Sequence, residues 1–252
     1  MAKIPPPQGA QAALRAVRLL KIFTIERSEM SLGELSRAAN LNKTTAHRLL
    51  RALQSEGLID RNSATSSYRL GAGLMALGVQ ALASSDLRRR IRPILRILAK
   101  ETGETATLEV PVEDSMLILD EVAGTHVVGS AGNVGTRWPI HATSTGKAWL
   151  AFDESGGVDR LNEYLQPLTS STLTDKEKLQ QQLDEIRNRG YAVTVDEVED
   201  GYTAVATIIR GVLGDIQGAL SIGGPSQRLQ PSRCAELGTT LRRTAQTLNL
   251  GI

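Results

Sequence analysis

The sequence predicts an α+β protein in three parts: a winged helix-turn-helix over residues 10–71, a linker helix over 72–84, and a larger domain with a mainly antiparallel sheet over 85–252. Two short helical patterns lie in tandem near the N-terminus. After Thr105, short apolar runs separated by turn residues replace the helical pattern. The charge is also uneven: residues 1–85 carry 11 Lys and Arg against 5 Asp and Glu (+6), and the remainder carries 18 against 22 (−4), which together give +2.

The N-terminal part begins with a predicted helix whose apolar side closes a small helical core. Its apolar residues at helical spacing are Leu14, Val17, Leu20 and Phe23. Ser31 and Glu34 have the spacing of a capping box at the start of a second helix. Asn42 is expected to cap a third helix, and Gly57 to end it in the left-handed conformation.

The third helix has one apolar face and one basic, hydroxyl-rich face. The apolar stripe consists of Ala46, Leu49, Leu50 and Leu53. The positions turned away from it are Lys43, Thr44, Thr45, Arg48, Arg51 and Gln54. Such residues contact phosphates and base edges in a major groove, so the pattern predicts a DNA-recognition helix, with His47 touching phosphate or packing. The alternative is a helical hairpin with a solvated basic face.

A β-hairpin is predicted directly after this helix, with strands over 58–61 and 68–70 around a small polar turn over 62–67. It forms the wing, whose tip could reach DNA backbone or minor groove. The aromatic content of 3% favours duplex DNA over single strands, which proteins bind by stacking. The candidate DNA-binding residues are therefore Ser31, Lys43, Thr44, Thr45, His47, Arg48, Arg51, Arg61, Ser67 and Arg69.

A connecting helix and an Arg-rich helix follow the wing. Leu74, Leu77, Ala81 and Leu82 predict that the linker is amphipathic and forms the seam of a homodimer. The next helix runs from about 87 to 100, capped over 84–86, with a kink or break at Pro93. Its Arg run is interpreted as a solvated face or as inter-subunit pairing, with a second nucleic-acid patch as the alternative.

The larger domain mixes strands with helices. Strands are predicted over 105–111, 115–122, 125–130, 191–195, 203–210 and 218–223, and helices over 147–153, 175–189 and 233–248. No apolar run is long enough for a bilayer, and no secretory signal is evident. Cys234 is the single cysteine, so no intrachain disulfide can form. A cytoplasmic protein with no membrane contact is expected.

Two stretches, in the right order and spacing, resemble the IclR (isocitrate lyase regulator) family of bacterial transcription factors. The first runs from Leu32 to Leu50 and continues in Gly57-Leu-Ile and Tyr68-Arg-Leu-Gly; the second comprises Pro139-Ile-His-Ala-Thr-Ser-Thr-Gly-Lys-Ala, Glu197, Gly201 and Ala219-Leu-Ser-Ile-Gly-Gly-Pro-Ser. The resemblance spans about Leu14 to Leu248. It implies a winged helix-turn-helix that binds operator DNA, a GAF-like effector-binding domain, and homodimers that commonly pair into tetramers. A repressor of a catabolic operon is expected rather than an activator.

The second stretch contains a candidate ligand site. Thr143 to Gly146 form the loop that enters a helix, where unpaired backbone N–H groups and neighbouring hydroxyls suit a small carboxylate. By resemblance, the pocket extends to residues before this loop and on late strands. The candidate effector-binding residues are Ser130, Trp138, His141, Thr143, Ser144, Thr145, Gly146, Glu197, Ala204, Ser221 and Gly223. Trp138 either favours a flat or larger acid or is a wall of the core. Ala204 and Gly223 replace polar or sulfur side chains found in several similar proteins.

An enzyme is the alternative function, specifically a small-molecule-processing enzyme with an accessory helical domain. Ser144 and Lys147 have the Ser-x-x-Lys spacing of acyl-transferring enzymes, but the partner motifs are absent. The His and Cys residues lack metal-ligand spacing, and no cofactor is expected. Glu197, Glu199 and Asp200 are interpreted as a solvated acidic turn rather than a general base or cation site, and Glu197 is a candidate for closing the pocket. Loss of DNA binding in Arg48→Ala would identify a regulator, and loss of activity in Ser144→Ala an enzyme.

Overall fold

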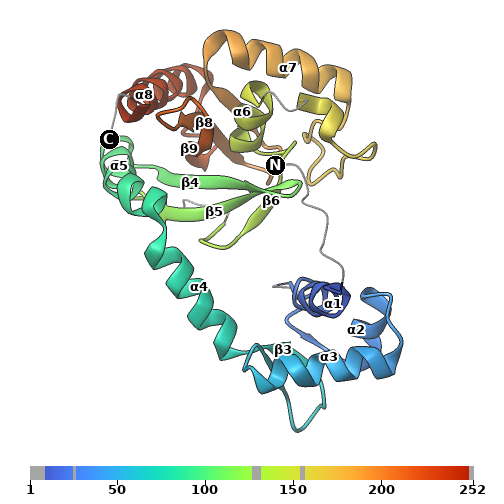
Figure 1. Ribbon diagram of the computed structural model, residues 1–252. Coiled ribbons are helices and arrows are strands. Elements are labelled where there is room, and N and C mark those ends of the chain that lie inside the picture. Colours follow the sequence, from blue (N-terminus) through green and yellow to red (C-terminus); the bar gives the residue numbers. More distant parts are fainter. Residues whose placement is uncertain (1–8, 25–26, 127–131, 154–156, 250–252) are drawn as a thin grey trace. The chain divides into compact units, whose positions relative to one another are not determined.

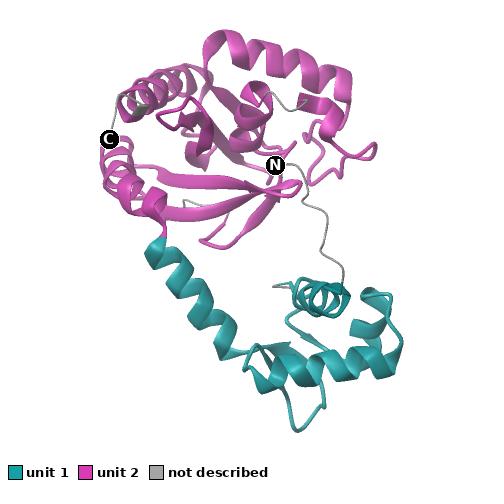
Figure 2. Cartoon of the chain, in the orientation of Figure 1, with its two compact units in different colours: residues 1–84 teal, residues 85–252 magenta. Residues whose placement is uncertain are grey.

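The computed structural model describes residues 9–24, 27–126, 132–153 and 157–249 (Figure 1). The chain divides into two compact units, Met1–Ser84 and Ser85–Ile252 (Figure 2). Within those described ranges, no helix combines the length and the apolar character needed to cross a bilayer.

The first unit consists of helices and a small antiparallel sheet with the strand order β1-β3-β2. Its elements are α1 (Gln11–Leu20), β1 (Glu29–Met30), α2 (Leu32–Ala38), α3 (Lys43–Ser55), β2 (Ile59–Arg61), β3 (Tyr68–Leu70) and α4 (Ala72–Ser84). The predicted capping box is confirmed: Ser31 Oγ accepts the Glu34 N–H at 3.3 Å, and Glu34 Oε2 accepts the Ser31 N–H at 2.9 Å. Gly57 has the predicted left-handed conformation, with φ of 68°.

The core of this unit corrects the prediction for the first helix. Val17 is 49% exposed, whereas Leu19 is fully buried. The predicted stripe included Phe23, but α1 ends at Leu20, so Phe23 enters the core from the segment after the helix and does not share its periodicity. The two-residue strand β1, which pairs with β3, was not predicted.

The α4 helix is not amphipathic, which contradicts the predicted stripe. Small and apolar residues occur around its whole circumference, and none is buried. Met75, Leu77 and Val79 are 67%, 54% and 66% exposed. The start of the helix is anchored to the end of α3, because Gly57 O accepts the N–H of Gly73 at 2.9 Å.

The second unit contains one six-stranded sheet, in the order β6-β5-β4-β9-β8-β7, in which every pairing is antiparallel. This confirms the predicted α+β fold. Its elements are α5 (Asp86–Thr102), β4 (Thr105–Val112), β5 (Ser115–Val122), β6 (Arg137–Pro139), α6 (Ser144–Phe152), the 3₁₀ turn η1 (Gly157–Arg160), α7 (Lys176–Arg189), β7 (Ala192–Val195), β8 (Tyr202–Arg210), β9 (Ile216–Pro225) and α8 (Pro231–Asn249).

Helices cover both faces of this sheet, so neighbouring residues in a central strand enter different cores (Figure 1). Val205 and Leu220 pack with α5 and α8, whereas Ala206 and Ala219 pack with α6 and α7. The period of two in side-chain direction along a strand explains the separation. The face toward α6 is the face that bears the candidate ligand site.

Four further features differ from the expectations. The predicted strand over 125–130 lies mostly outside the described residues, and the described part, Thr125 and His126, is not a strand. The strand β6 was not predicted. The α5 helix continues through Pro93, which lies on its exposed side, so the expected break is absent. In place of a wholly solvated Arg run, two α5 arginines, Arg88 and Arg92, form ion pairs with the buried Asp120 on β5.

Candidate functional site

The outward face of α3 is the candidate nucleic-acid surface. Asn42 Oδ1 accepts the Thr45 N–H at 2.8 Å and fixes the start of the helix, as predicted. The predicted apolar stripe of Ala46, Leu49, Leu50 and Leu53 is buried. The outward residues Lys43, Thr44, Arg48, Arg51 and Gln54 are exposed, and Thr45 and His47 are half-buried. The helix therefore has the two faces that the sequence predicts.

Most cations of this surface are uncommitted. Within the described chain, Lys43, Arg48, Arg51 and Arg69 have no acidic group at salt-bridge distance, unlike several arginines of the second unit. An exposed cation with no internal partner keeps its full charge available for phosphate. The surface is thus basic in effect as well as in composition.

The wing is held by a residue that the sequence analysis missed. Asn62 Nδ2 donates to Glu29 Oε1 at 2.8 Å, and Asn62 Oδ1 accepts the Ala64 N–H at 3.0 Å. The first bond joins the turn to the neighbouring strand β1, and the second lies within the turn. Arg61 lies over the ring of Tyr68, with 5.8 Å between its guanidinium carbon and the ring centre. A short Asn side chain that satisfies local backbone groups is a common turn device, and that chemistry is the signal that could have identified Asn62.

Two other predicted DNA-binding residues are placed as follows. The hydroxyl of Ser31 donates to Glu34 Oε2 at 2.6 Å, so its first role is to cap α2. This bond also lowers the pKa of the Glu34 carboxyl. Ser67 is half-buried between the turn and β3.

A pocket in the second unit lies between the sheet and the start of α6. The empty space between its walls, including the open mouth, is about 450 Å³. The centre of a water-sized sphere can occupy only about 30 Å³ of that space. Its lining comprises Thr107, Glu109, Ile118, Gly132, Trp138, Thr143, Ser144, Thr145, Thr194, Val198, Tyr202, Ala204 and Ser221. The lining is narrow and rich in hydroxyls, and none of the described lining residues is a Lys, Arg or His.

The strand register explains why the floor of the pocket is hollow. Ala204 pairs with Thr194 on one side and with Gly223 on the other. Thr107 pairs with Ser221 in the adjacent row. All these side chains are small, so space remains between the sheet and α6.

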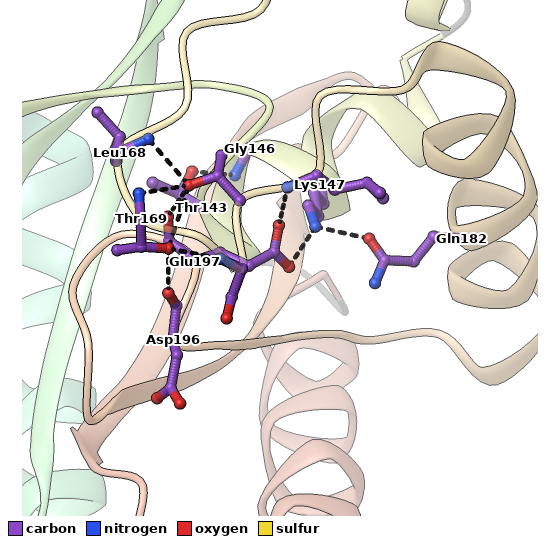
Figure 3. Close-up of polar contacts among 11 residues, drawn as sticks. Thr143, Gly146, Lys147, Leu168, Thr169, Gln182, Asp196 and Glu197 are labelled. Atoms are coloured by element: carbon purple, nitrogen blue, oxygen red, sulfur yellow. Dashed lines mark hydrogen bonds and ion pairs between the residues drawn. The ribbon is translucent and has the colours of Figure 1, made fainter.

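The predicted N-terminal loop of α6 forms the wall opposite this floor. Thr143 Oγ1 accepts the Gly146 N–H at 2.9 Å and caps the helix (Figure 3). Ser144 and Thr145 occupy the first turn, where backbone N–H groups have no acceptor within the helix. Gly146 does not line the pocket. A Cβ there would lie 1.9 Å from Ile140 O, so the glycine makes room for the protein's own backbone.

Glu197 lies outside the lining and holds a buried cation instead. Its carboxylate is paired with Lys147 Nζ, which is fully buried and also donates to Gln182 Oε1 at 2.6 Å (Figure 3). Glu197 Oε2 accepts the Leu173 N–H at 3.1 Å. Burial lowers the pKa of the Lys147 ammonium, and the negative charge of Glu197 opposes that shift. The predicted solvated turn is therefore correct only for Glu199 and Asp200, which are exposed.

The Ser-x-x-Lys reading has no geometric support, because Lys147 is engaged by Glu197 and Gln182. His141 Nε2 lies 3.1 Å from Gln166 O, and His141 does not line the pocket. Burial lowers its pKa. No group of three His, Cys, Asp or Glu side chains gathers as a metal site within the described ranges.

The remaining predicted pocket residues divide three ways. Trp138, Ala204 and Ser221 line the pocket, and Ser130 lies outside the described residues. Gly223 is covered by Tyr202, whose hydroxyl oxygen would lie 2.0 Å from a Cβ at that glycine. Tyr202 therefore fills the volume that a larger side chain at 223 would occupy.

Glu109 is the main residue that the sequence analysis missed. It is 7% exposed and accepts hydrogen bonds from Thr107 Oγ1 at 2.9 Å and from Thr145 Oγ1 at 2.6 Å. Burial raises the pKa of the Glu109 carboxyl, and the two hydroxyls partly oppose the shift. A signal was present: Thr105, Thr107 and Glu109 alternate with Ala106 and Leu108, so one face of a buried strand is polar.

Comparisons with known proteins give a consistent match over the whole chain. The model of the bacterial transcriptional regulator IclR C-terminal family matches residues 79–250, and that of the IclR helix-turn-helix domain matches residues 12–63. The chain is 30% identical over 254 residues to the transcriptional repressor IclR of Escherichia coli K12, covering 99% of this chain and 93% of that protein.

Solved structures agree. An IclR transcriptional regulator from Silicibacter sp. has a TM-score of 0.84 and 28% identity, with 94% of each chain covered. An IclR homolog from Microbacterium hydrocarbonoxydans, solved in complex with 4-hydroxybenzoate, has a TM-score of 0.76 and 26% identity, covering 94% of this chain and 98% of that chain.

Proposed function

This chain belongs to the IclR family of bacterial transcriptional regulators, and we propose that it is a ligand-responsive repressor of a catabolic operon. Both family models and the relatives are transcriptional regulators, so the chain is a regulator and the alternative of an enzyme is set aside. One observation carries the proposal. The same chain joins a helix with uncommitted outward cations to a separate unit with a hydroxyl-lined pocket.

The DNA contacts are proposed on the outward face of α3 and on the wing. Lys43, Arg51 and the wing residues Arg61 and Arg69 are exposed cations suited to phosphates, which fix the register of a protein on the duplex. Thr45 and Arg48 are proposed to read base edges in the major groove. In this proposal, the phosphate-contacting residues supply affinity, and Thr45 and Arg48 supply sequence preference.

The effector is proposed to be a small organic acid held at the start of α6. The first-turn N–H groups of Ser144 and Thr145 and the helix dipole favour an anion there. The narrow lining limits the ligand to a few heavy atoms beside Trp138. The relative in complex with 4-hydroxybenzoate, a carboxylic acid, supports this class of ligand.

The two sites are proposed to communicate through a homodimer, and two homodimers are proposed to pair into a dimer of dimers. The exposed apolar surface of α4 is the proposed seam. A symmetric dimer reads a pseudo-palindromic operator whose half-sites have a fixed spacing. An effector that prefers one arrangement of the paired α4 helices would shift DNA affinity by about 1–3 kcal/mol, a typical allosteric coupling.

The test is selection of genomic fragments by the purified full-length protein, followed by sequencing, with and without a panel of small carboxylic acids. Enrichment of a pseudo-palindrome beside a catabolic operon, reduced by one acid, is the expected result. Enrichment that no acid changes would refute effector sensing and leave the DNA-binding function. No enrichment at low salt, with folded and oligomeric protein, would refute the proposed DNA-binding surface.

A further inference from the structure

The polar groups of the pocket do not form a simple anion site. The described lining supplies hydroxyl groups, the indole N–H of Trp138 and one carboxyl, that of Glu109, and no cationic side chain. Glu109 lies against the start of α6, because Thr145 in the first turn donates directly to its Oε2 at 2.6 Å. A ligand carboxylate at the first-turn N–H groups therefore has a buried carboxyl as its immediate neighbour.

This neighbour sets a requirement on the ligand. The hydrogen bonds that Thr107 and Thr145 donate to Glu109 favour its ionised form and oppose the effect of burial on its pKa. When Glu109 is ionised, it and a ligand carboxylate in the same buried site repel each other, and the energy of that repulsion is large where water is excluded. The Thr107 and Thr145 hydroxyls already donate one hydrogen bond each to Glu109, to different oxygen atoms. Each carboxylate oxygen has a second lone pair, so Glu109 can accept a further hydrogen bond from a ligand.

We infer that the effector carries a hydrogen-bond donor, a hydroxyl or an ammonium group, close to its carboxylate, and that Glu109 selects for this donor. The inference rests on the proposed binding of a small acid in this pocket. The direct contact between Thr145 and Glu109 places the two ligand groups within a few bonds of each other. The class is therefore short hydroxy acids or amino acids, and plain acids of the same length are disfavoured.

The test uses matched acids that differ in one group: acetate, glycolate and glycine, then propionate, lactate and alanine. Binding to the full-length protein is measured by calorimetry. A hydrogen bond to a charged group predicts that the donor-bearing member binds about ten- to a hundredfold more tightly than the plain acid. The hydroxy and amino members of each set distinguish the two kinds of donor.

Two variants test whether Glu109 is the residue that produces the preference for donor-bearing acids. Glu109→Gln keeps the size of the side chain and removes its negative charge, so the plain acids should bind more tightly and the preference should fall below about threefold. Glu101→Gln makes the same chemical change on the exposed surface of α5 and should leave the preference intact. A Glu109→Gln protein that keeps the full preference would overturn the inference.

The other possible results also decide whether the inference stands. Equal binding of plain and donor-bearing acids to the wild type leaves the proposed function standing and overturns this inference alone. Absence of binding by every acid refutes both the inference and the proposed carboxylate effector. If Glu109→Gln fails to fold, the wild-type ranking within each set still gives the answer.

Discussion

Arg48 and Lys43 lie on the exposed face of α3 at different distances along the helix, and we propose a different kind of DNA contact for each. Lys43 is the first residue of α3, and Arg48 lies one and a half turns further on. Neither has an acidic partner in the described chain. The proposed roles of Arg48 and Lys43 can be distinguished by how DNA binding changes in each variant, as well as by how much it is weakened.

We expect Arg48→Ala to weaken operator binding by about 1–3 kcal/mol and to relax sequence preference, because it removes a base-edge contact. Lys43→Ala should weaken binding to all sequences similarly and reduce the salt slope by about 1, because it removes a phosphate contact. Titrations of operator and random duplex at several salt concentrations measure both. Arg96→Ala, an exposed change on α5, is the control. Equal and parallel losses in the two variants would contradict the division of roles.

Glu109 gives a pH-dependent prediction. Its pKa in the folded protein is raised above the ordinary value of 4.5 by burial, with a smaller contribution from the charge of Glu121. The stability that it contributes is fully present below pH 4.5 and is lost as pH rises through the raised pKa. Glu109→Gln has no such loss. Its melting temperature relative to wild type should therefore increase with pH above 4.5 and then level off.

Thermal melts from pH 4.5 to pH 8 check this expectation, with Glu101→Gln as the control for removal of a surface charge. A difference between Glu109→Gln and wild type that stays flat or falls with rising pH would show that Glu109 is not destabilised by burial of its charge.

At the residue scale, local patterns predicted the helix-start part of the pocket, and the family resemblance predicted Trp138, Ala204 and Ser221, but other lining residues were missed. Thr143, Ser144 and Thr145 were found because a helix start is a local pattern. Glu109 and Tyr202 were missed because strand register brings them there. That register is fixed by pairing of β4 with β9 and of β9 with β8, and β4 is distant in sequence from both of the other strands.

At the scale of elements, Lys147 on α6 forms a buried ion pair with Glu197 in the segment after β7 and donates a hydrogen bond to Gln182 on α7. A buried ion pair contributes little net stability, but loss of one partner leaves an uncompensated charge. Lys147→Met should lower the free energy of unfolding by about 3–5 kcal/mol. Adding Glu197→Leu should recover much of that loss.

Chemical denaturation of both single variants and the double variant measures the coupling. A double variant less stable than Lys147→Met would contradict this account and assign Glu197 a stabilising role through its bond to Leu173 N–H.

The junction of α3 and α4 offers a matched pair of glycines. A Cβ at Gly71 would lie 2.4 Å from Gly57 O, a backbone atom, whereas a Cβ at Gly78 would meet nothing within 4 Å. Gly71→Ala should destabilise the first unit by about 1–3 kcal/mol through overpacking. Gly78→Ala should stabilise it by about 0.5–1 kcal/mol, because it replaces a glycine inside a helix. Unfolding followed through a label on the first unit measures both, and similar effects would refute the proposed steric role of Gly57.

Element types were predicted better than element environments. The caps at Ser31 and Asn42 and the helices of the second unit follow from local chemistry and were correct. The predicted apolar stripe of α1 was wrong in including Phe23, because the helix ends before that residue. The strands β1 and β6 were missed because two or three residues are too few to show a periodic pattern. These segments are strands because they pair with β3 and β5, respectively.

At the scale of the whole molecule, the exposed apolar surface of α4 is the feature that the proposed homodimer accounts for. An apolar helix without a buried residue is unusual in a monomer. Leu77→Glu should weaken self-association at least about tenfold and lower operator affinity, while both units stay folded, because Leu77 is 54% exposed.

Sedimentation velocity over a range of concentrations, with circular dichroism for folding, measures the effect. Arg37→Glu, on the exposed surface of α2, is the control for added negative charge. A wild type that remains monomeric at micromolar concentration would contradict the dimer, and an associated Leu77→Glu variant would place the seam elsewhere.

The two covered faces of the large sheet have a practical consequence for changing the ligand that the proposed effector pocket accepts. Along β4, alternate residues Thr107 and Glu109 line the pocket, while Ala106 and Leu108 belong to the opposite core. Residues that line the pocket and residues that form the opposite core therefore alternate along the same strand. A library that varies only the pocket-facing positions leaves the second core intact, so the protein is suited to laboratory evolution as a biosensor for other small metabolites.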